Sequence, residues 1–146
     1  MGAFNLIQMT KTLNVLVIED DLIEVMKLNR TVKSLDYNHN IIEAKDGEEA
    51  IEKLKQNDYR PDVILLDLNM PKMNGIEFLK FLKNDKEFKY LPVIILTTSK
   101  NQKDLFKCYE LGIAGYIIKP LKYEDYVVKI KKTLDYWSTN ELIRVK

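Results

Sequence analysis

Short apolar runs rich in β-branched residues alternate with stretches of helical period five times along the chain. The runs are bounded by polar or turn residues, and they lie at residues 15–18, 41–42, 63–66, 93–96 and 116–118. Continuous rather than alternating apolarity is typical of strands covered on both faces, as in a parallel sheet. The pattern predicts five strands.

The stretches between these runs predict five helices, because their apolar residues recur every three or four positions. They cover residues 22–35, 46–57, 75–83, 102–111 and 123–139. Asp46 is placed as an N-cap with Glu49 as its capping-box partner, and Gly112 as a C-terminal cap. Strands alternating with helices predict an α/β fold: an open parallel sheet with helices on both faces.

Composition narrows the class of protein. The 146 residues are 46% hydrophobic and 31% charged, which fits one ordinary soluble domain. Lys plus Arg total 23 against 22 for Asp plus Glu, so we expect no direct nucleic-acid or membrane binding. The single cysteine, Cys108, is typical of a reducing compartment, and we expect a cytoplasmic protein. No apolar run approaches the ~20 residues of a membrane helix.

The domain organisation expected from these patterns is simple. We expect an N-terminal tail over residues 1–12, one domain over residues 13–140 and a C-terminal tail over residues 141–146. Fewer than about ten residues follow the last predicted helix, so we expect no output domain and action through another protein.

Polar side chains follow four of the five predicted strands. In chain order they are Glu19, Asp20 and Asp21; Asp67 and Asn69; Thr97, Thr98 and Ser99; and Lys119. In open parallel sheets, ligands bind beyond the carboxyl ends of the strands. If the first and third strands are neighbours, Glu19, Asp20 and Asp67 lie together and repel one another unless a cation joins them. The all-oxygen set predicts Mg²⁺.

Structural roles compete with functional ones for some of these residues. Asp21 is expected to cap the helix that follows it. Thr97 is either a functional hydroxyl or a cap of the next helix, a place that Ser99 or Asn101 also fits. A lysine leaving an apolar sheet is costly unless it meets anions, so Lys119 is interpreted as functional, aimed by the extended or cis geometry that Pro120 favours.

The segments VLVIEDD, ILLDLNMP, VIILTTS and YIIKP, in this order, resemble the response-regulator receiver domains of two-component signalling. The resemblance covers about residues 13–138, nearly the whole chain. It implies a flavodoxin-like three-layer fold of five βα units around a five-stranded parallel sheet of order 2-1-3-4-5.

The resemblance also implies roles at the matching positions. Asp67 would be the phosphoacceptor, taking a phosphoryl group from a sensor histidine kinase or a small phosphodonor. Asp20, Asp67 and the backbone carbonyl of Asn69 would hold Mg²⁺, with Glu19 acting through a water. Lys119 would pair with Asp67 and then with the acyl phosphate.

A switch is implied at two further positions. Thr97 would turn to hydrogen-bond a phosphoryl oxygen, and Tyr116 would move inward, which changes the face around residues 102–139. Asn69 and Ser99 flank the expected water path to the acyl phosphate. Because their side chains are small and uncharged, we expect no strongly accelerated hydrolysis.

The residue two positions after Asp67 argues against a phosphatase of a different class. A haloacid dehalogenase-type phosphatase needs a second acid two residues after the nucleophile, where this chain has Asn69. We therefore expect an autocatalytic phosphoacceptor rather than a turnover enzyme. The sequence leaves open a phosphorelay intermediate that serves a histidine phosphotransfer protein, a terminal switch on a protein target, and a phosphorylation-independent binding module.

Several residues receive plain interpretations. His39 is expected to be solvated in a polar turn, and Cys108 to be a small packed hydrophobe. Tyr123 and Tyr126 are candidates for a partner surface, with homodimerisation left open. Trp137 is expected to cover the end of an apolar stripe that also contains Val127, Ile130 and Leu134.

Overall fold

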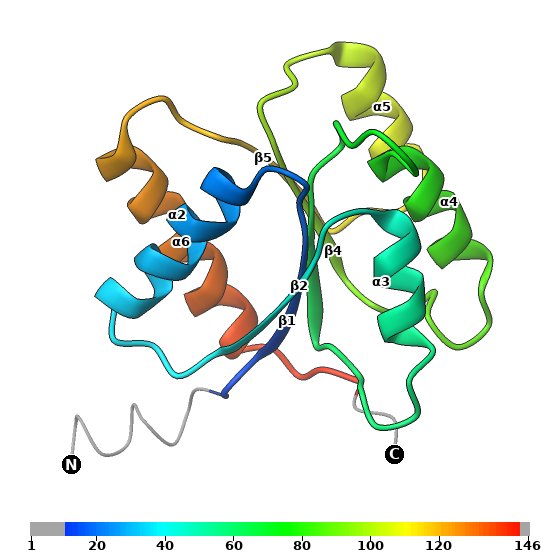
Figure 1. Ribbon diagram of the computed structural model, residues 1–146, viewed down its shortest axis with the longest axis horizontal. Helices are drawn as coiled ribbons and strands as arrows, with labels where there is room; N and C mark the ends of the chain where they lie inside the picture. Colours follow the sequence, from blue (N-terminus) through cyan, green and yellow to red (C-terminus); the bar gives the residue numbers. More distant parts are fainter. Residues whose placement is uncertain (1–10, 144–146) are drawn as a thin grey trace.

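The computed structural model describes residues 11–143, which form five βα units around one sheet (Figure 1). The strands are β1 (Asn14–Ile18), β2 (Asn40–Ala44), β3 (Val63–Leu66), β4 (Val93–Thr97) and β5 (Gly115–Ile118). The helices are α2 (Leu22–Ser34), α3 (Gly47–Leu54), α4 (Gly75–Asn84), α5 (Gln102–Glu110) and α6 (Tyr123–Ser138).

The sheet has the order β2-β1-β3-β4-β5, and every pair of neighbouring strands is parallel. The three-layer arrangement and strand order expected from the sequence are confirmed. Figure 1 shows α2 and α6 on one face of the sheet and α3, α4 and α5 on the other.

Successive residues of the inner strands contribute side chains to two separate hydrophobic cores, because side chains point alternately to the two faces of a strand. One core joins α3, α4 and α5 to the sheet through strand residues Leu16, Ile18, Ile64, Leu66, Val93 and Ile95. The other joins α2 and α6 through strand residues Val15, Val17, Val63, Leu65, Ile94 and Leu96. Burial on both faces explains why these runs are continuously apolar.

The two edge strands depart from the expectation of strands covered on both faces. In β2, four of five residues are at least partly exposed, and Ile42 keeps 38% of its surface accessible. Every residue of β5 is half-buried. An edge strand has a neighbour on one side only, which leaves its flanks open to solvent.

The helix boundaries follow local capping. The Asp46 side chain accepts a hydrogen bond from the Glu49 amide at 2.9 Å, as expected, and α3 ends at Leu54, three residues earlier than predicted. Gly112 follows α5 with φ +92°, a left-handed conformation that suits glycine. A full capping box also links Asn74 and Glu77 at the start of α4, where the sequence analysis had placed none.

The buried face of α6 differs from the predicted stripe: Tyr126 and Ser138 are buried, whereas Val127 is only partly buried. Tyr126 is 1% exposed and packs with Ile130 and Leu134 in the core beneath α2. It is therefore a core residue and not part of a partner surface, because a residue four positions before Ile130 shares its face of the helix. Tyr123 stays on the surface, and Trp137 is half-buried against the same core.

The expected N-terminal tail lies mainly outside the described residues, whereas residues 141–143 of the expected C-terminal tail are described. At the described ends, the Lys11 amide donates to the Ser138 carbonyl at 2.9 Å, and Leu142 packs against the α2–α6 core. Within residues 11–143, no helix is both long enough and apolar enough to span a membrane.

Candidate functional site

The backbone of the sheet fixes the positions of the polar residues that follow its strands. The Asp67 amide donates to the Ile18 carbonyl at 3.0 Å, and the Lys119 amide donates to the Thr97 carbonyl at 2.8 Å. The Glu19 amide likewise extends the hydrogen bonding between β1 and β2. These residues are held by the last hydrogen bonds of the sheet, so their side chains start from rigid backbone.

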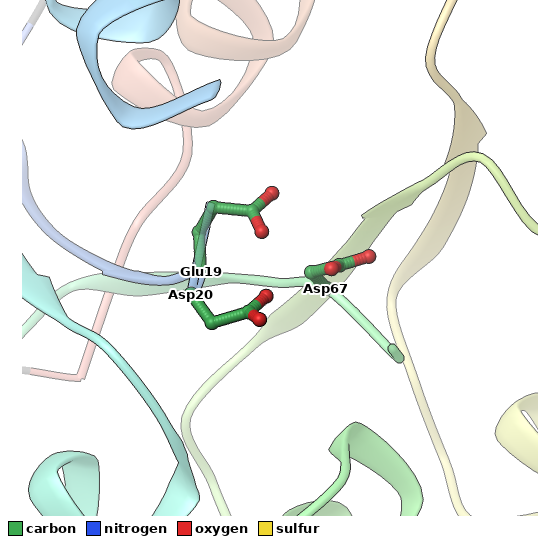
Figure 2. Close-up of side chains that lie close together, drawn as sticks. All are labelled: Glu19, Asp20 and Asp67. Carbon is green, nitrogen blue, oxygen red and sulfur yellow. The ribbon is translucent and has the colours of Figure 1, made fainter. Parts of the chain in front are cut away.

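Glu19, Asp20 and Asp67 form an acidic cluster at this edge (Figure 2). One carboxylate oxygen from each residue lies within 4.8 Å of the others. Glu19 and Asp67 are each 7% exposed, whereas Asp20 is exposed to solvent. The cluster is a site with two buried walls and one open side, and its oxygens suit a hard divalent cation.

Glu19 is a member of the acidic cluster whose pKa is shifted. The pKa of Glu19 is raised to about 7, mainly by burial and to a lesser extent by the nearby charge of Asp67. A hydrogen bond and ion pair from Lys119 oppose these effects. A cation beside Glu19 would favour its charged form, because it offsets the repulsion from Asp67.

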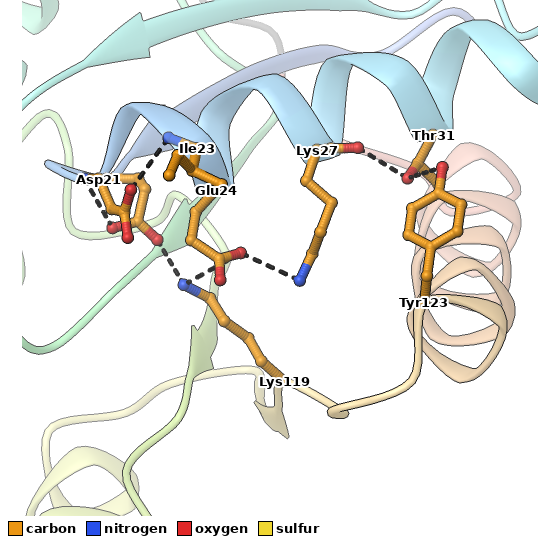
Figure 3. Close-up of polar contacts among 8 residues, drawn as sticks. Asp21, Ile23, Glu24, Lys27, Thr31, Lys119 and Tyr123 are labelled. Carbon is orange, nitrogen blue, oxygen red and sulfur yellow. Dashed lines mark hydrogen bonds and ion pairs between the residues drawn. The ribbon is translucent and has the colours of Figure 1, made fainter.

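Lys119 lies in a different arrangement from the one the resemblance implied (Figure 3). Its side chain is 6% exposed, and its ammonium group donates a hydrogen bond to Glu19 and lies 3.9 Å from Glu24 Oε2. Among the ion pairs of residues 11–143, none joins Lys119 to Asp67. The expected resting pair with Asp67 is therefore replaced by pairs with Glu19 and with Glu24 of α2.

The loop after β4 links the two predicted switch residues. Thr97 is fully buried, and its hydroxyl oxygen accepts a hydrogen bond from the Ser99 amide at 3.3 Å. The Tyr116 hydroxyl donates to the Ser99 carbonyl at 3.0 Å. Both side chains thus hold the backbone of one residue, and a turn of Thr97 would break one of these contacts.

Two site residues escaped the sequence analysis. Glu24 is one of them. It lies in the first turn of α2, the helix that begins directly after Glu19, Asp20 and Asp21. Gly75 is the other: a Cβ there would come within 2.6 Å of the Asp67 carbonyl oxygen. In the sequence, the position of this glycine directly after the N-cap Asn74 could have indicated that the start of α4 approaches another backbone closely. Asn69 is exposed in the intervening loop.

The structure shows which polar residues cap α2 and α5. Asp21 caps α2 by accepting from the Ile23 amide at 2.9 Å, as expected. Asn101, rather than Thr97 or Ser99, caps α5, because its side chain accepts from Lys103 and Asp104. Thr97 is therefore free of the capping role. The Lys119–Pro120 bond is trans, since the described residues contain no cis peptide.

Two further residues lie away from the acidic cluster. Cys108 is fully buried in the core that α3, α4 and α5 form with the sheet, as expected of a packed hydrophobe. His39 differs from the expectation of a solvated residue: it is half-buried, its Nδ1 accepts from the Leu13 amide at 3.0 Å, and its ring meets Tyr37 edge-on.

Comparison with known proteins agrees with this geometry. The response regulator receiver domain family matches residues 15–131. The chain belongs to this family.

Receivers of known sequence and structure match most of the chain. The response regulator Rcp1 of Synechocystis is 33% identical over 128 residues, 84% of this chain and 87% of Rcp1. The chemotaxis protein CheY-3 of Vibrio cholerae is 31% identical over 127 residues, 87% of this chain and 95% of CheY-3. The phosphorylated cyanobacterial phytochrome response regulator RcpA superposes with a TM-score of 0.84 and 33% identity, covering 90% of this chain and 99% of RcpA.

Receiver domains are signalling proteins of two-component systems and not typical turnover enzymes. A crystal structure of Rcp1 in its Mn²⁺-bound form has a TM-score of 0.83 and 32% identity, and it covers 90% of this chain and 99% of Rcp1. The acidic cluster at the carboxyl edge of the present sheet is consistent with a divalent cation in this receiver as well.

Proposed function

We propose that Asp67 accepts a phosphoryl group from a sensor histidine kinase, with the help of Mg²⁺, and that the modified domain signals to a protein partner. The observation that carries this proposal is the gathering of Glu19, Asp20 and Asp67 within 4.8 Å beside the buried ammonium group of Lys119. Such a site brings an anionic nucleophile together with the cations that an incoming phosphoryl group needs.

The residues present fit a magnesium ion. Asp20 and Asp67 would hold it directly, together with the backbone carbonyl of Asn69, and Glu19 would act through a water. The exposed side of Asp20 leaves room for the waters that Mg²⁺ usually keeps. When bound, the ion neutralises negative charge on the phosphoryl oxygens and on the cluster.

In the proposed transfer, a carboxylate oxygen of Asp67 attacks the phosphorus atom of a phosphohistidine. The P–O bond of an acyl phosphate forms as the P–N bond breaks, and the imidazole nitrogen keeps the electron pair of that bond. Lys119 would move from Glu19 and Glu24 to a phosphoryl oxygen, and the Thr97 hydroxyl would donate to another. With a small donor such as acetyl phosphate, the bond that breaks is a P–O bond and acetate leaves.

The loop after β4 would carry the signal outward. When Thr97 turns toward the phosphoryl group, its oxygen leaves the Ser99 amide, and Tyr116, bonded to the carbonyl of the same residue, follows. The exposed side chains of Phe106 and Tyr109 on α5 lie beyond this loop. The changed face of α5, β5 and α6 is where the partner would bind, in the cytoplasm.

An apolar surface borders the acidic cluster and suits a protein phosphodonor. Leu22, Ile23 and Met26 on the first two turns of α2 are exposed, and so is Leu121, two residues after Lys119. Isolated apolar side chains on a surface need no explanation, but a group of them around a reactive carboxylate fits a binding surface for another protein. The kinase would cover these residues while its phosphohistidine reaches Asp67.

The test is intact-protein mass spectrometry after incubation with acetyl phosphate, with and without Mg²⁺. We expect a Mg²⁺-dependent gain of one phosphoryl mass in the wild-type protein and none in Asp67→Asn. Asp58→Asn is the matched control, because Asp58 is exposed in the turn after α3, away from the cluster. This control should gain the phosphoryl mass as the wild type does.

Uptake in the Asp67→Asn variant would overturn the assignment of the nucleophile. No uptake in the wild type, under conditions that label a known receiver and with rapid hydrolysis excluded, would favour a phosphorylation-independent binding module. Transfer onward to a histidine phosphotransfer protein would identify a relay intermediate.

A further inference from the structure

We propose that Glu24 is a positioning residue that holds Lys119 away from Asp67 before phosphorylation, and that Lys27 weakens this hold. The inference rests on the proposed function, because it concerns how readily Lys119 reaches a phosphoryl group on Asp67. It assigns a role to charged residues of α2, outside the set that the receiver resemblance picks out.

The first observation is the location of the Lys119 ammonium group. It donates a hydrogen bond to Glu19, after β1, and it lies 3.9 Å from Oε2 of Glu24 on α2 (Figure 3). The side chain of Lys119 is 6% exposed and that of Glu24 is 23% exposed. At such burial the attraction between the two charges is screened far less than at an open surface.

The second observation is the state of Glu24 itself. Its Oε2 atom is buried, and among residues 11–143 it has no hydrogen-bond partner. The same atom lies 3.3 Å from Lys27 Nζ, one turn along α2. One carboxylate oxygen of Glu24 is thus shared between the ammonium groups of Lys27 and Lys119. The positive charge of Lys27 therefore weakens the attraction between Glu24 and Lys119.

The third observation is that α6 fixes Lys27. The Lys27 ammonium group lies 4.3 Å from the centre of the Tyr126 ring, a cation–π distance, and Tyr126 is buried in the core. The next turn of α2 is tied to the same helix, since the Thr31 and Tyr123 hydroxyls are 3.1 Å apart. Lys27 therefore keeps its place beside Glu24 when Lys119 moves.

These contacts define the direction of each effect. Glu24 stabilises the resting position of Lys119 but not its position at the phosphoryl group, so it slows phosphorylation by favouring the ground state. Lys27 offsets part of the Glu24 charge and makes Lys119 easier to release. Removing either charge should change the rate, with opposite signs.

The experiment measures the rate of phosphorylation by acetyl phosphate at fixed pH and saturating Mg²⁺, using intact-protein mass spectrometry. We expect Glu24→Gln to react about three- to tenfold faster than the wild type, and Lys27→Gln to react about three- to tenfold slower, the range of a partly buried ion pair. Glu110→Gln is the matched control. It removes the acid of an exposed Lys–Glu pair three residues apart on α5, and its rate should stay that of the wild type.

The double variant Glu24→Gln/Lys27→Gln distinguishes the proposed role from a simpler explanation. In that explanation, each charge only changes how strongly the protein attracts the anionic donor acetyl phosphate. If Lys27 acts through Glu24, the double variant reacts like Glu24→Gln alone, because nothing remains for Lys27 to neutralise. If each charge acts independently through space, the two effects add and the double variant reacts like the wild type. That additivity would overturn the proposal.

Failure of this inference differs from failure of the proposed function. A wild-type protein that takes up no phosphoryl group contradicts the function of Asp67. A wild-type protein that is labelled normally, with single variants at the wild-type rate and unchanged melting temperatures, contradicts the role of Glu24. A slower Glu24→Gln variant would also contradict it, since that result makes Glu24 a helper of the reaction.

Discussion

Gly75, the first residue of α4, packs directly against the backbone of Asp67. A Cβ atom at Gly75 would lie 2.6 Å from the Asp67 carbonyl oxygen and 2.8 Å from Leu68 Cα. The Gly75 amide also donates to the Leu68 carbonyl at 3.1 Å. The missing side chain lets the start of α4 pack closely over the loop that carries Asp67.

Gly75→Ala is expected to lower the free energy of unfolding by about 2 kcal/mol, because the backbone on one side of the contact must move. It should also slow phosphorylation, since the loop from Asp67 to Asn69 is displaced. Urea denaturation and the acetyl phosphate assay measure the two effects. Gly115→Ala is the control: its Cβ would meet Ile94 at an ordinary 3.7 Å. An equal loss of stability in both variants would refute the steric explanation.

Mg²⁺ is expected to stabilise the protein by relieving repulsion among Glu19, Asp20 and Asp67. At ten times the dissociation constant, a ligand that binds only the folded state adds about 1.4 kcal/mol, and EDTA should remove this gain. Asp20→Asn should lose most of the response in a thermal melt. Asp21→Asn should keep it, because Asp21 caps α2 and lies outside the cluster. A full Mg²⁺ response in Asp20→Asn would exclude Asp20 as a ligand.

The pH dependence of stability should carry a contribution from His39. Burial lowers the pKa of His39 from its ordinary value of 6.5, and its Nδ1 accepts the Leu13 amide only in the neutral form. The unfolded chain therefore binds a proton more readily, and the contribution is lost as pH falls below about 6.5. In urea titrations, the wild type should lose more stability between pH 7.5 and pH 5 than His39→Gln. Parallel curves for the two proteins would contradict this prediction.

The acyl phosphate should persist for minutes rather than seconds. Asn69 carries no acid or base, and the Ser99 hydroxyl donates to Asp104 at 2.8 Å, so neither side chain is set to activate a water. The decay of the phosphoryl mass after removal of acetyl phosphate measures the lifetime. Asn69→Asp, which adds a carboxylate at this position, is the informative comparison. A wild-type half-life of seconds would show that another group activates the water.

Cys108 should be inert in the folded protein. Its side chain is fully buried, and burial raises the pKa of its thiol to about 11, so little thiolate is present near neutral pH. Iodoacetamide at pH 7.5 should label the protein in urea but leave the native protein unmodified, as seen by mass. Rapid labelling of the native protein would instead indicate opening of the core that α3, α4 and α5 form with the sheet.

The sequence predicted more of the inner sheet than of its margins. β1, β3 and β4 are buried on both faces, so their sequences are continuous apolar runs. These strands lie at the positions expected from the runs. The edge strand β2 gave only Ile41 and Ile42 as a signal, and it is five residues long because its backbone pairs with β1. Pairing across a sheet depends on the neighbouring strand, which a local pattern does not contain.

The sequence predicted most residues of the candidate site, but not Glu24 or Gly75 and not the contacts within the site. The spacing of strands and polar residues brought Glu19, Asp20, Asp67, Thr97 and Lys119 to one edge, because parallel strands end together. Which acid Lys119 meets depends on where α2 lies over the sheet, and that packing places Glu24 beside it. Tyr126 likewise became a core residue only because α6 packs that face against α2.

By itself the sequence determined the order of elements, the three-layer class and the set of polar residues at the carboxyl edge, since these follow from local periodicity and from resemblance. The tertiary structure alone decided the charge pairs of Lys119, the burial of His39 and the need for glycine at position 75. These features join residues many positions apart, and their energies depend on distances and burial that arise only when the helices close on the sheet.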